Sequence, residues 1–184
     1  MKKFTEGYID IHSHILPNID DGAKDMEMSL KMLDIAYAEG IRGVVVTPHY
    51  HPGKSMVGYS DLISRFEKYK TEIEKRYSDM KLYLGREVYY TSDVIGAIKN
   101  GEHLGMIDNH YILLEYSPER EYSYIRRSIY EILQQEYIPI IAHVERCEAL
   151  IMDIERIYEL REMGALIQIN AAAVDGKNGT QIKK

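Results

Sequence analysis

The sequence is poor in cysteine, in positive charge and in long apolar runs. Its single cysteine, Cys147, excludes an internal disulfide framework and a cysteine-based structural zinc site, and it suits a reducing compartment. With 23 basic against 29 acidic side chains, the formal net charge of −6 argues against a nucleic-acid-binding protein, which usually carries a basic surface. No apolar run approaches the roughly 20 residues that span a bilayer, and the N-terminal segment lacks the apolar stretch of a signal peptide. We therefore expect a cytoplasmic protein that neither crosses a membrane nor binds nucleic acid.

Short apolar or β-branched runs alternate with longer segments whose apolar residues recur at helical spacing. This alternation predicts strands at 8–12, 41–47, 81–89, 111–116, 138–143 and 165–170. It predicts helices at 25–39, at 60–77 with Ser60 as the capping residue, and at 92–99, 122–136 and 153–163. Because strands and helices alternate along the chain, we expect an α/β fold, with a parallel sheet or barrel, in one domain over residues 1–184.

The strongest local signal is the segment Asp10-Ile11-His12-Ser13-His14 at the end of the first predicted strand. Residues two apart in a strand point to the same side, so His12 and His14 can bind one metal ion together. This pattern also arises by chance, so the interpretation depends on where the other candidate ligands fall.

Further candidate ligands recur at the carboxyl ends of later strands. His49 follows the second predicted strand, and Glu87, Glu115 and His143 lie at or near the ends of the third, fourth and fifth. Consecutive members are separated by about 30 residues, the length of one strand–helix unit. Since the carboxyl ends of parallel strands meet at one rim, we expect these imidazoles and carboxylates to gather in one polar cup.

Each of these residues also has an ordinary structural interpretation. Glu87 and Glu115 could be solvated surface acids, although Glu115 lies in an apolar run where an unpaired buried carboxylate would be costly and a metal ion would offset that cost. His143 could be a hydrogen-bonded core histidine. Asp20 and Asp21 could form a turn and cap the next helix, or face the metal cup.

Four more polar residues lie near the predicted strands. His51, close behind His49, could contact a ligand residue or the substrate. Arg146 could pair with a surface acid, but an arginine beside bound cations indicates an anionic ligand, for which phosphate is the natural candidate. His103 and His110 precede a strand and are expected to be structural or surface residues.

The candidate ligands donate only imidazole nitrogen or carboxylate oxygen, which favours Mn, Fe or Zn over a soft-metal site. A carboxylate shared between two such ions is an arrangement suited to metal-assisted hydrolysis of phosphate esters. A cysteine nucleophile does not fit, because the residue six positions after Cys147 is Asp153, so the Cys-x5-Arg loop of the thiol phosphatases is absent.

Six segments carry a family resemblance: DIHSHILPNIDDGAKD, VVVTPHYHPG, LYLGREVYY, YILLEYSP, IPIIAHVER and LIQINAAAVDGKNG. They resemble the manganese-dependent tyrosine-protein phosphatases of bacterial capsular and exopolysaccharide operons, which belong to the polymerase and histidinol phosphatase (PHP) superfamily. The resemblance covers almost the whole chain. It implies a distorted parallel (β/α) barrel of the PHP type and, as substrate, the phosphotyrosine tail of a partner tyrosine autokinase that controls polysaccharide synthesis.

The resemblance also implies a site of up to three Mn2+ ions. Its metal ligands would be His12, His14, Asp21, His49, Glu87, Glu115 and His143. By position, His12, His14 and Glu87 would hold one ion. A second would be held by Glu87, Glu115 and His143, and Asp21 and His49 would hold part of a third. Arg146 would contact the substrate phosphate, with Asp21 as a second catalytic residue.

Two features depart from the family pattern. Val144 stands where the family usually has proline after the histidine. Family members also continue for about two further strand–helix units and end on a Ser-Asp-Ala-His strand that supplies one aspartate and one histidine ligand. We therefore expect a C-terminally truncated chain that carries seven of nine ligands. An incomplete barrel would leave the strand at 165–170 as an open edge, which a homo-oligomer could cover.

Two alternatives to a phosphotyrosine phosphatase stay open. One is a truncated remnant that binds metal or a partner with little or no turnover. The other is a PHP enzyme of different specificity, either a phosphatase for a small metabolite such as histidinol phosphate or a nuclease. The net acidity and the IDDGA segment argue against both of these.

Overall fold

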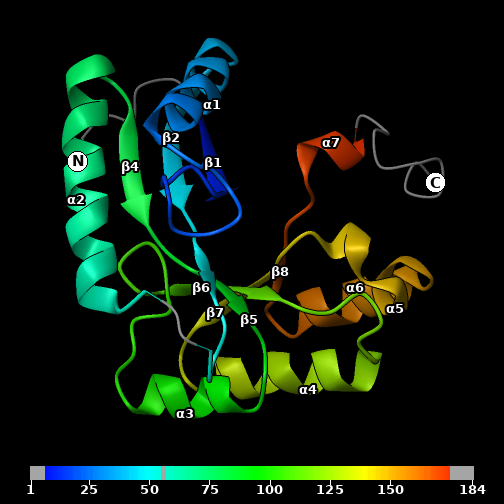
Figure 1. Ribbon diagram of the computed structural model, residues 1–184. Coiled ribbons are helices and arrows are strands. Elements are labelled where there is room, and N and C mark those ends of the chain that lie inside the picture. Colours follow the sequence, from blue (N-terminus) through cyan, green and yellow to red (C-terminus); the bar gives the residue numbers. More distant parts are fainter. Residues whose placement is uncertain (1–6, 55–56, 175–184) are drawn as a thin grey trace. The chain divides into compact units, whose positions relative to one another are not determined.

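The computed structural model describes residues 7–54 and 57–174. The chain divides into two compact units, drawn in Figure 1. The first holds the residues up to Tyr50 together with Lys54–Arg86. The second holds His51–Gly53 together with the chain from Glu87 onward. Each unit is built from parallel strands and helices.

The first unit contains a three-stranded parallel sheet. Its order is β1 (Tyr8–Ser13), β2 (Ile41–Val46) and β4 (Lys81–Leu84), and the two-residue strand β3 (His49–Tyr50) follows β2. Two helices pack against the sheet: α1 (Met26–Ala38) contacts β2 and α2 (Tyr59–Arg76) contacts β4 (Figure 1).

The core of this unit follows from the sequence periodicity. On α2 the buried residues are Leu62, Phe66, Tyr69 and Ile73, which recur at helical spacing. They pack in one cluster with side chains of β2 and β4. The two helices are also joined by a hydrogen bond of 2.7 Å between the hydroxyls of Tyr69 and Ser29.

The second unit contains four parallel strands that pair in the order β5 (Glu87–Tyr89), β6 (Tyr111–Glu115), β7 (Ile138–Ile141) and β8 (Leu166–Ile167). Its helices are α3 (Asp93–Lys99), α4 (Tyr122–Leu133), α5 (Glu148–Ile151), α6 (Ile154–Glu162) and α7 (Ala171–Val174), with a 3-10 turn at Val144–Arg146. Helix α4 contacts β7 and buries Ile125, Ile129 and Ile132 on one face. The middle of β6 is fully buried at Ile112, Leu113 and Leu114.

The structure confirms the predicted α/β class with parallel strands. It also confirms helices close to the five predicted ranges, and the first of them ends before Gly40, which has the left-handed φ of +92° typical of a residue after a helix. The closure of a barrel and the single domain over 1–184 stay predictions.

Three details of the predicted elements are wrong. The strand predicted at 81–89 is two strands in different sheets, because Gly85 makes the last hydrogen bond to β2, at Val46 O, and the chain then leaves that sheet. Ser60 does not cap α2; the helix begins at Tyr59, and Gly58 takes the extended backbone of the capping position. The strand predicted at 165–170 shrinks to Leu166–Ile167.

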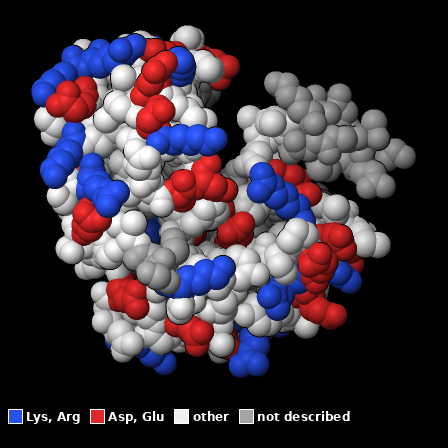
Figure 2. All heavy atoms as spheres, viewed as in Figure 1, with Lys and Arg blue, Asp and Glu red and all other residues white. Residues whose placement is uncertain are grey.

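Charges of both signs cover the outer face of α2. Figure 2 shows its Lys and Arg side chains interspersed with Asp and Glu, and two of the pairs, Arg65 with Asp61 and Lys75 with Glu72, form ion pairs within the helix. This face therefore presents no basic stripe. Among the described helices, none has the length and apolar character needed to cross a bilayer.

Candidate metal centre

The first group of candidate ligands lies at the end of β1. His12 and His14 lie two residues apart, and their Nε2 atoms are 3.2 Å from each other. Two ligands that each bind one ion at about 2.1 Å lie roughly 3.0–3.4 Å apart, so this spacing fits a shared cation. Beneath them Asp10 accepts a hydrogen bond from the backbone N–H of His12, and burial raises the pKa of its carboxyl group.

A tight loop returns Asp20 and Asp21 to His14. The loop is closed by backbone hydrogen bonds from Ala23 N to His14 O, at 2.9 Å, and from Asn18 N to Ala23 O, at 3.0 Å. Gly22 allows this closure, since a Cβ atom there would lie 2.0 Å from the carbonyl oxygen of His14. The glycine of the IDDG segment is therefore required by close backbone approach.

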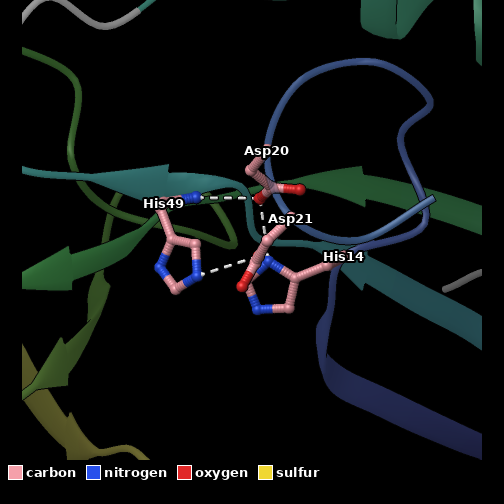
Figure 3. Close-up of side chains that lie close together, drawn as sticks. All are labelled: His14, Asp20, Asp21 and His49. Carbon is pink, nitrogen blue, oxygen red and sulfur yellow. Dashed lines mark hydrogen bonds and ion pairs between the residues drawn. The ribbon is translucent and has the colours of Figure 1, made fainter. Parts of the chain in front are cut away.

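Asp20 is the most heavily hydrogen-bonded carboxylate of the loop. Its Oδ2 lies 2.8 Å from His14 Nδ1 and accepts from the backbone N–H of His49 at 3.2 Å (Figure 3). Its Oδ1 accepts from Gly22 N at 3.1 Å. Burial raises the pKa of Asp20, but the hydrogen bonds from His14, Gly22 and His49 outweigh it and lower the pKa below its usual value. An ionised Asp20 holds the Nδ1 proton of His14 and so presents Nε2 as a lone-pair donor, as partners of metal-binding histidines do.

His49 joins this group because the ends of β1 and β2 are tied together. Thr47 N donates to Ser13 O at 2.9 Å, and Ser13 N donates to Thr47 Oγ1 at 3.0 Å. The rings of His14 and His49 consequently lie 4.6 Å apart, and His49 Nε2 is 3.3 Å from Asp21 Oδ1 (Figure 3). The Asp21 side chain is 82% exposed, whereas that of Asp20 is only 7% exposed.

These four residues satisfy the simplest requirement of a cation site. One ligand atom from each of His14, Asp20, Asp21 and His49 can be chosen so that all lie within 4.8 Å of one another. The donors are imidazole nitrogens and carboxylate oxygens, which suit Mn, Fe or Zn. The group therefore fits a divalent metal ion.

A second group forms from Glu115 at the carboxyl end of β6, His143 just after β7, and Glu87, which begins β5 and does not end the strand as the sequence predicted. His143 Nε2 lies 2.8 Å from Glu87 Oε1 and 3.7 Å from Glu115 Oε1. The side chain of Glu87 is 1% exposed and that of Glu115 is 23% exposed, so Glu115 is only half-buried despite its apolar run. Two carboxylates and an imidazole are donors that suit Mn, Fe or Zn, so these three side chains fit a divalent cation.

The backbone of His143 is held in an unusual conformation. Its φ of 31° and ψ of 56° lie in the left-handed region, which non-glycine residues rarely occupy. Gln168, directly after β8, stabilises this turn: its Oε1 accepts from His143 N at 2.6 Å and its backbone O accepts from Val144 N at 3.0 Å. The sequence pattern gave no signal for Gln168, and it left the positioning role of Asp20 unrecognised among two adjacent aspartates.

The remaining candidates fall at different places. Arg146 is exposed on the 3-10 turn that follows His143. His51 stacks on Tyr89, with ring centroids 4.7 Å apart. His103 and His110 are exposed, and His110 lies at the start of β6, the end opposite Glu115.

Cys147 does not resemble a nucleophile. Its side chain is buried, and burial raises the pKa of the thiol to about 11, which keeps it protonated at neutral pH. Apolar packing accounts for this residue.

Comparison with known proteins gives a consistent result. Residues 8–184 match the family model for capsular polysaccharide synthesis, CpsB/CapC. Tyrosine-protein phosphatase CpsB of Streptococcus agalactiae serotype V is 33% identical over 90% of this chain and 68% of its own length. Tyrosine-protein phosphatase YwqE of Bacillus subtilis is 32% identical over 95% of this chain and 69% of its own.

The fold is similar to a solved structure from work on YwqE of Bacillus subtilis and CpsB of Streptococcus pneumoniae, described as metal-dependent tyrosine phosphatases. The match has a TM-score of 0.85 and 30% sequence identity, and it covers 96% of this chain and 71% of that one.

Proposed function

This chain belongs to the CpsB/CapC family, and we propose that it is a metal-dependent phosphatase that removes phosphate from protein tyrosines. The observation that carries the proposal is the convergence of two carboxylates, Glu87 and Glu115, on His143 at the ends of three parallel strands. The reaction is proposed because the similar proteins are tyrosine-protein phosphatases. The cluster offers carboxylate and imidazole donors that suit a metal ion for this reaction.

The proposed ligands are His12, His14, Asp21, His49, Glu87, Glu115 and His143, and the proposed ion is Mn2+, with Fe or Zn as alternatives and up to three ions in all. When bound, such ions neutralise charge on the transferring phosphoryl group and activate water for attack. That Glu87 shares an ion with His12 and His14 stays a prediction from the family resemblance.

The chain's own side chains have distinct proposed roles. Arg146 is exposed just beyond His143, where its guanidinium can bind two phosphate oxygens at once. Asp21, with its exposed carboxylate, orients the attacking water by accepting a hydrogen bond. Asp20 holds the tautomer of His14, and Gln168 holds the backbone of His143.

The test is hydrolysis of para-nitrophenyl phosphate and of a phosphotyrosine peptide by purified protein with Mn2+, and after removal of metal by EDTA. We expect activity only with metal. The Glu115→Gln variant should lose most of it, because a neutral amide is a poor ligand. Glu131→Gln is the matched control, since Glu131 lies in the same unit but bonds Tyr90 and Arg127.

The result that overturns the proposal is folded, metal-loaded wild-type protein that hydrolyses neither substrate. That result would favour the alternative of a metal-binding remnant without turnover. Activity that survives complete metal removal would equally refute the metal-dependent mechanism.

We further propose that the substrate is the phosphotyrosine tail of a bacterial tyrosine autokinase in polysaccharide synthesis, in keeping with the family description. A cytoplasmic location accords with a single, buried cysteine.

Self-association that covers the β8 edge is the proposed oligomer, and β8 pairs on one side with β7. Sedimentation of the purified protein tests this last point, and a monomer at all concentrations refutes it.

A further inference from the structure

A pair of stacked aromatic rings lies beside the Glu87, Glu115 and His143 cluster. Tyr89 is in β5, two residues after Glu87, so both side chains point to the same face of the sheet. In the register of β5 with β6, Tyr89 is directly opposite Glu115. The ring of His51 stacks on Tyr89 with centroids 4.7 Å apart and planes inclined by 10°.

Tyr89 differs from the tyrosines that serve packing in this protein. Among the described residues, the hydroxyls of at least seven of those bond another side chain: Tyr37, Tyr69, Tyr77, Tyr90, Tyr116, Tyr122 and Tyr137. The hydroxyl of Tyr89 makes no hydrogen bond to any residue that the structure describes, and its ring is only half-buried. The neighbouring Tyr90 points to the opposite face, where it lines a cavity of about 460 Å³ between α3 and α4.

The orientation of His51 is also fixed. Its Nδ1 lies 3.0 Å from the carbonyl oxygen of Pro52 and donates a hydrogen bond to it. This hydrogen bond helps to hold the ring parallel to Tyr89. The two parallel rings form an aromatic pair, which we call the Tyr89–His51 stack.

We propose that the Tyr89–His51 stack binds the aromatic ring of the substrate and so selects aryl over alkyl phosphate esters. The proposal rests on the phosphatase function proposed above. Adjacent strands lie about 4.8 Å apart, so a phosphate bound beside Glu115 has its ester substituent within reach of the neighbouring Tyr89. In phosphotyrosine that substituent is a phenyl ring, which stacks on aromatic side chains, whereas the chain of an alkyl ester does not.

The test is a comparison of two non-hydrolysable ligands, phenylphosphonate and n-butylphosphonate, titrated by calorimetry into metal-loaded protein. Their phosphonate groups are alike, so their difference reports the aromatic ring. In Tyr89→Leu, binding of phenylphosphonate should weaken by about two- to tenfold more than binding of butylphosphonate, the range expected for loss of an aromatic pair. Tyr89→Phe should restore the preference because the hydroxyl has no partner among the described residues.

Tyr158→Leu is the matched control, since Tyr158 is a half-exposed tyrosine on α6 outside the site. It should leave both affinities unchanged, and thermal unfolding of each variant verifies its fold. In turnover of phenyl phosphate, Tyr89→Leu should raise KM more than it lowers kcat. His51→Ala should give the same pattern to a smaller extent.

The outcomes separate the two proposals. If Tyr89→Leu weakens both phosphonates equally, or wild-type protein binds neither, the aromatic subsite is overturned. If the wild type prefers phenylphosphonate through Tyr89 but hydrolyses no phosphate ester, the subsite stands and the phosphatase function falls. If the wild type hydrolyses phosphotyrosine and Tyr89→Leu binds both phosphonates with wild-type affinity, the phosphatase function stands and the aromatic subsite is overturned.

Discussion

Replacing Asp20 with asparagine removes one negative charge while keeping the size of the side chain. In the native protein both oxygens accept hydrogen bonds, Oδ2 from His14 and His49 and Oδ1 from Gly22. An asparagine has only one acceptor oxygen, so its NH2 group must face at least one of these donors. Asp20→Asn therefore weakens the hold on the His14 ring and leaves a donor facing another donor.

The size of the effect follows from the chemistry of that contact. A hydrogen bond to a charged group contributes about 1.5–3 kcal/mol, and loss of a carboxylate that orients a metal-binding histidine lowers metal affinity about 10- to 100-fold. The two ranges agree, because each tenfold change corresponds to about 1.4 kcal/mol. Asp20 is 7% exposed, so solvent screening discounts the contact little.

The assay is competition for Mn2+ between the protein and a chelator of known affinity at pH 7. We expect Asp20→Asn to release the ion of the His14, Asp21 and His49 group at about 10- to 100-fold lower chelator concentration than wild type. Asp79→Asn is the control. Asp79 lies in the same unit, accepts a hydrogen bond from Tyr37 at 2.7 Å and forms an ion pair with Arg42 at 3.0 Å. It belongs to neither candidate group of metal ligands.

The positioning role of Asp20 is refuted if Asp20→Asn binds Mn2+ within about twofold of wild type while its unfolding temperature falls as that of Asp79→Asn does. Asp20 would then stabilise the loop without acting on the imidazole. Equal loss of metal by both variants would show a general loss of structure and would also count against the positioning role.

Three further predictions concern residues around the same groups. Gly22→Ala should abolish tight metal binding by the His14 loop, because its Cβ would lie 2.0 Å from His14 O; metal content after gel filtration checks this. Gln168→Leu should lower kcat about 10- to 100-fold in steady-state kinetics by releasing the left-handed turn at His143, and unchanged kcat would contradict it. Cys147→Ala should retain activity within about twofold, and the native thiol should resist alkylation at pH 8, since burial raises its pKa to about 11; inactivation by iodoacetamide in the folded state would oppose this.

Elements that depend on burial periodicity were predictable from the sequence. The run at 111–116 contains Ile112, Leu113 and Leu114, which are all fully buried in β6, and the apolar residues predicted on one face of α2 are its buried ones. Such patterns reflect the partition of side chains between core and water, which the sequence encodes directly.

Features that depend on single backbone hydrogen bonds were not predictable. Apolar residues lie on both sides of Gly85 and Arg86 in 81–89, and the ladder ends at Gly85, whose N–H donates to the carbonyl oxygen of Val46, the last residue of β2. The short β8 ends at Ile167, and Gln168 directly after it bonds Ile141 and Val144 through its backbone and His143 N through its side chain. The periodicity of the sequence does not show where the last backbone hydrogen bond between two strands forms.

The same distinction applies to the candidate site. Placing Glu115 and His143 at strand ends requires only the topology of a parallel sheet. Glu87 meets them although it begins β5 and does not end a strand. Choosing Asp20 over Asp21 as the partner of His14 requires the path of a loop, which Gly22 and a close backbone approach determine. That these side chains bind metal stays a prediction.

The hydrogen bonds that Gln168 makes to the His143 turn have a consequence for the order of events on the ribosome. Glu87, Glu115 and His143 are all synthesised before Gln168, yet the turn that aims the imidazole is completed only by this later residue. A nascent chain that has just passed His143 therefore carries the side chains of Glu87, Glu115 and His143 without the hydrogen bonds from Gln168 that hold the turn. If these side chains hold an ion, we expect tight binding only after β8 has emerged, so a ribosome stalled before residue 168 should carry a chain that retains metal poorly.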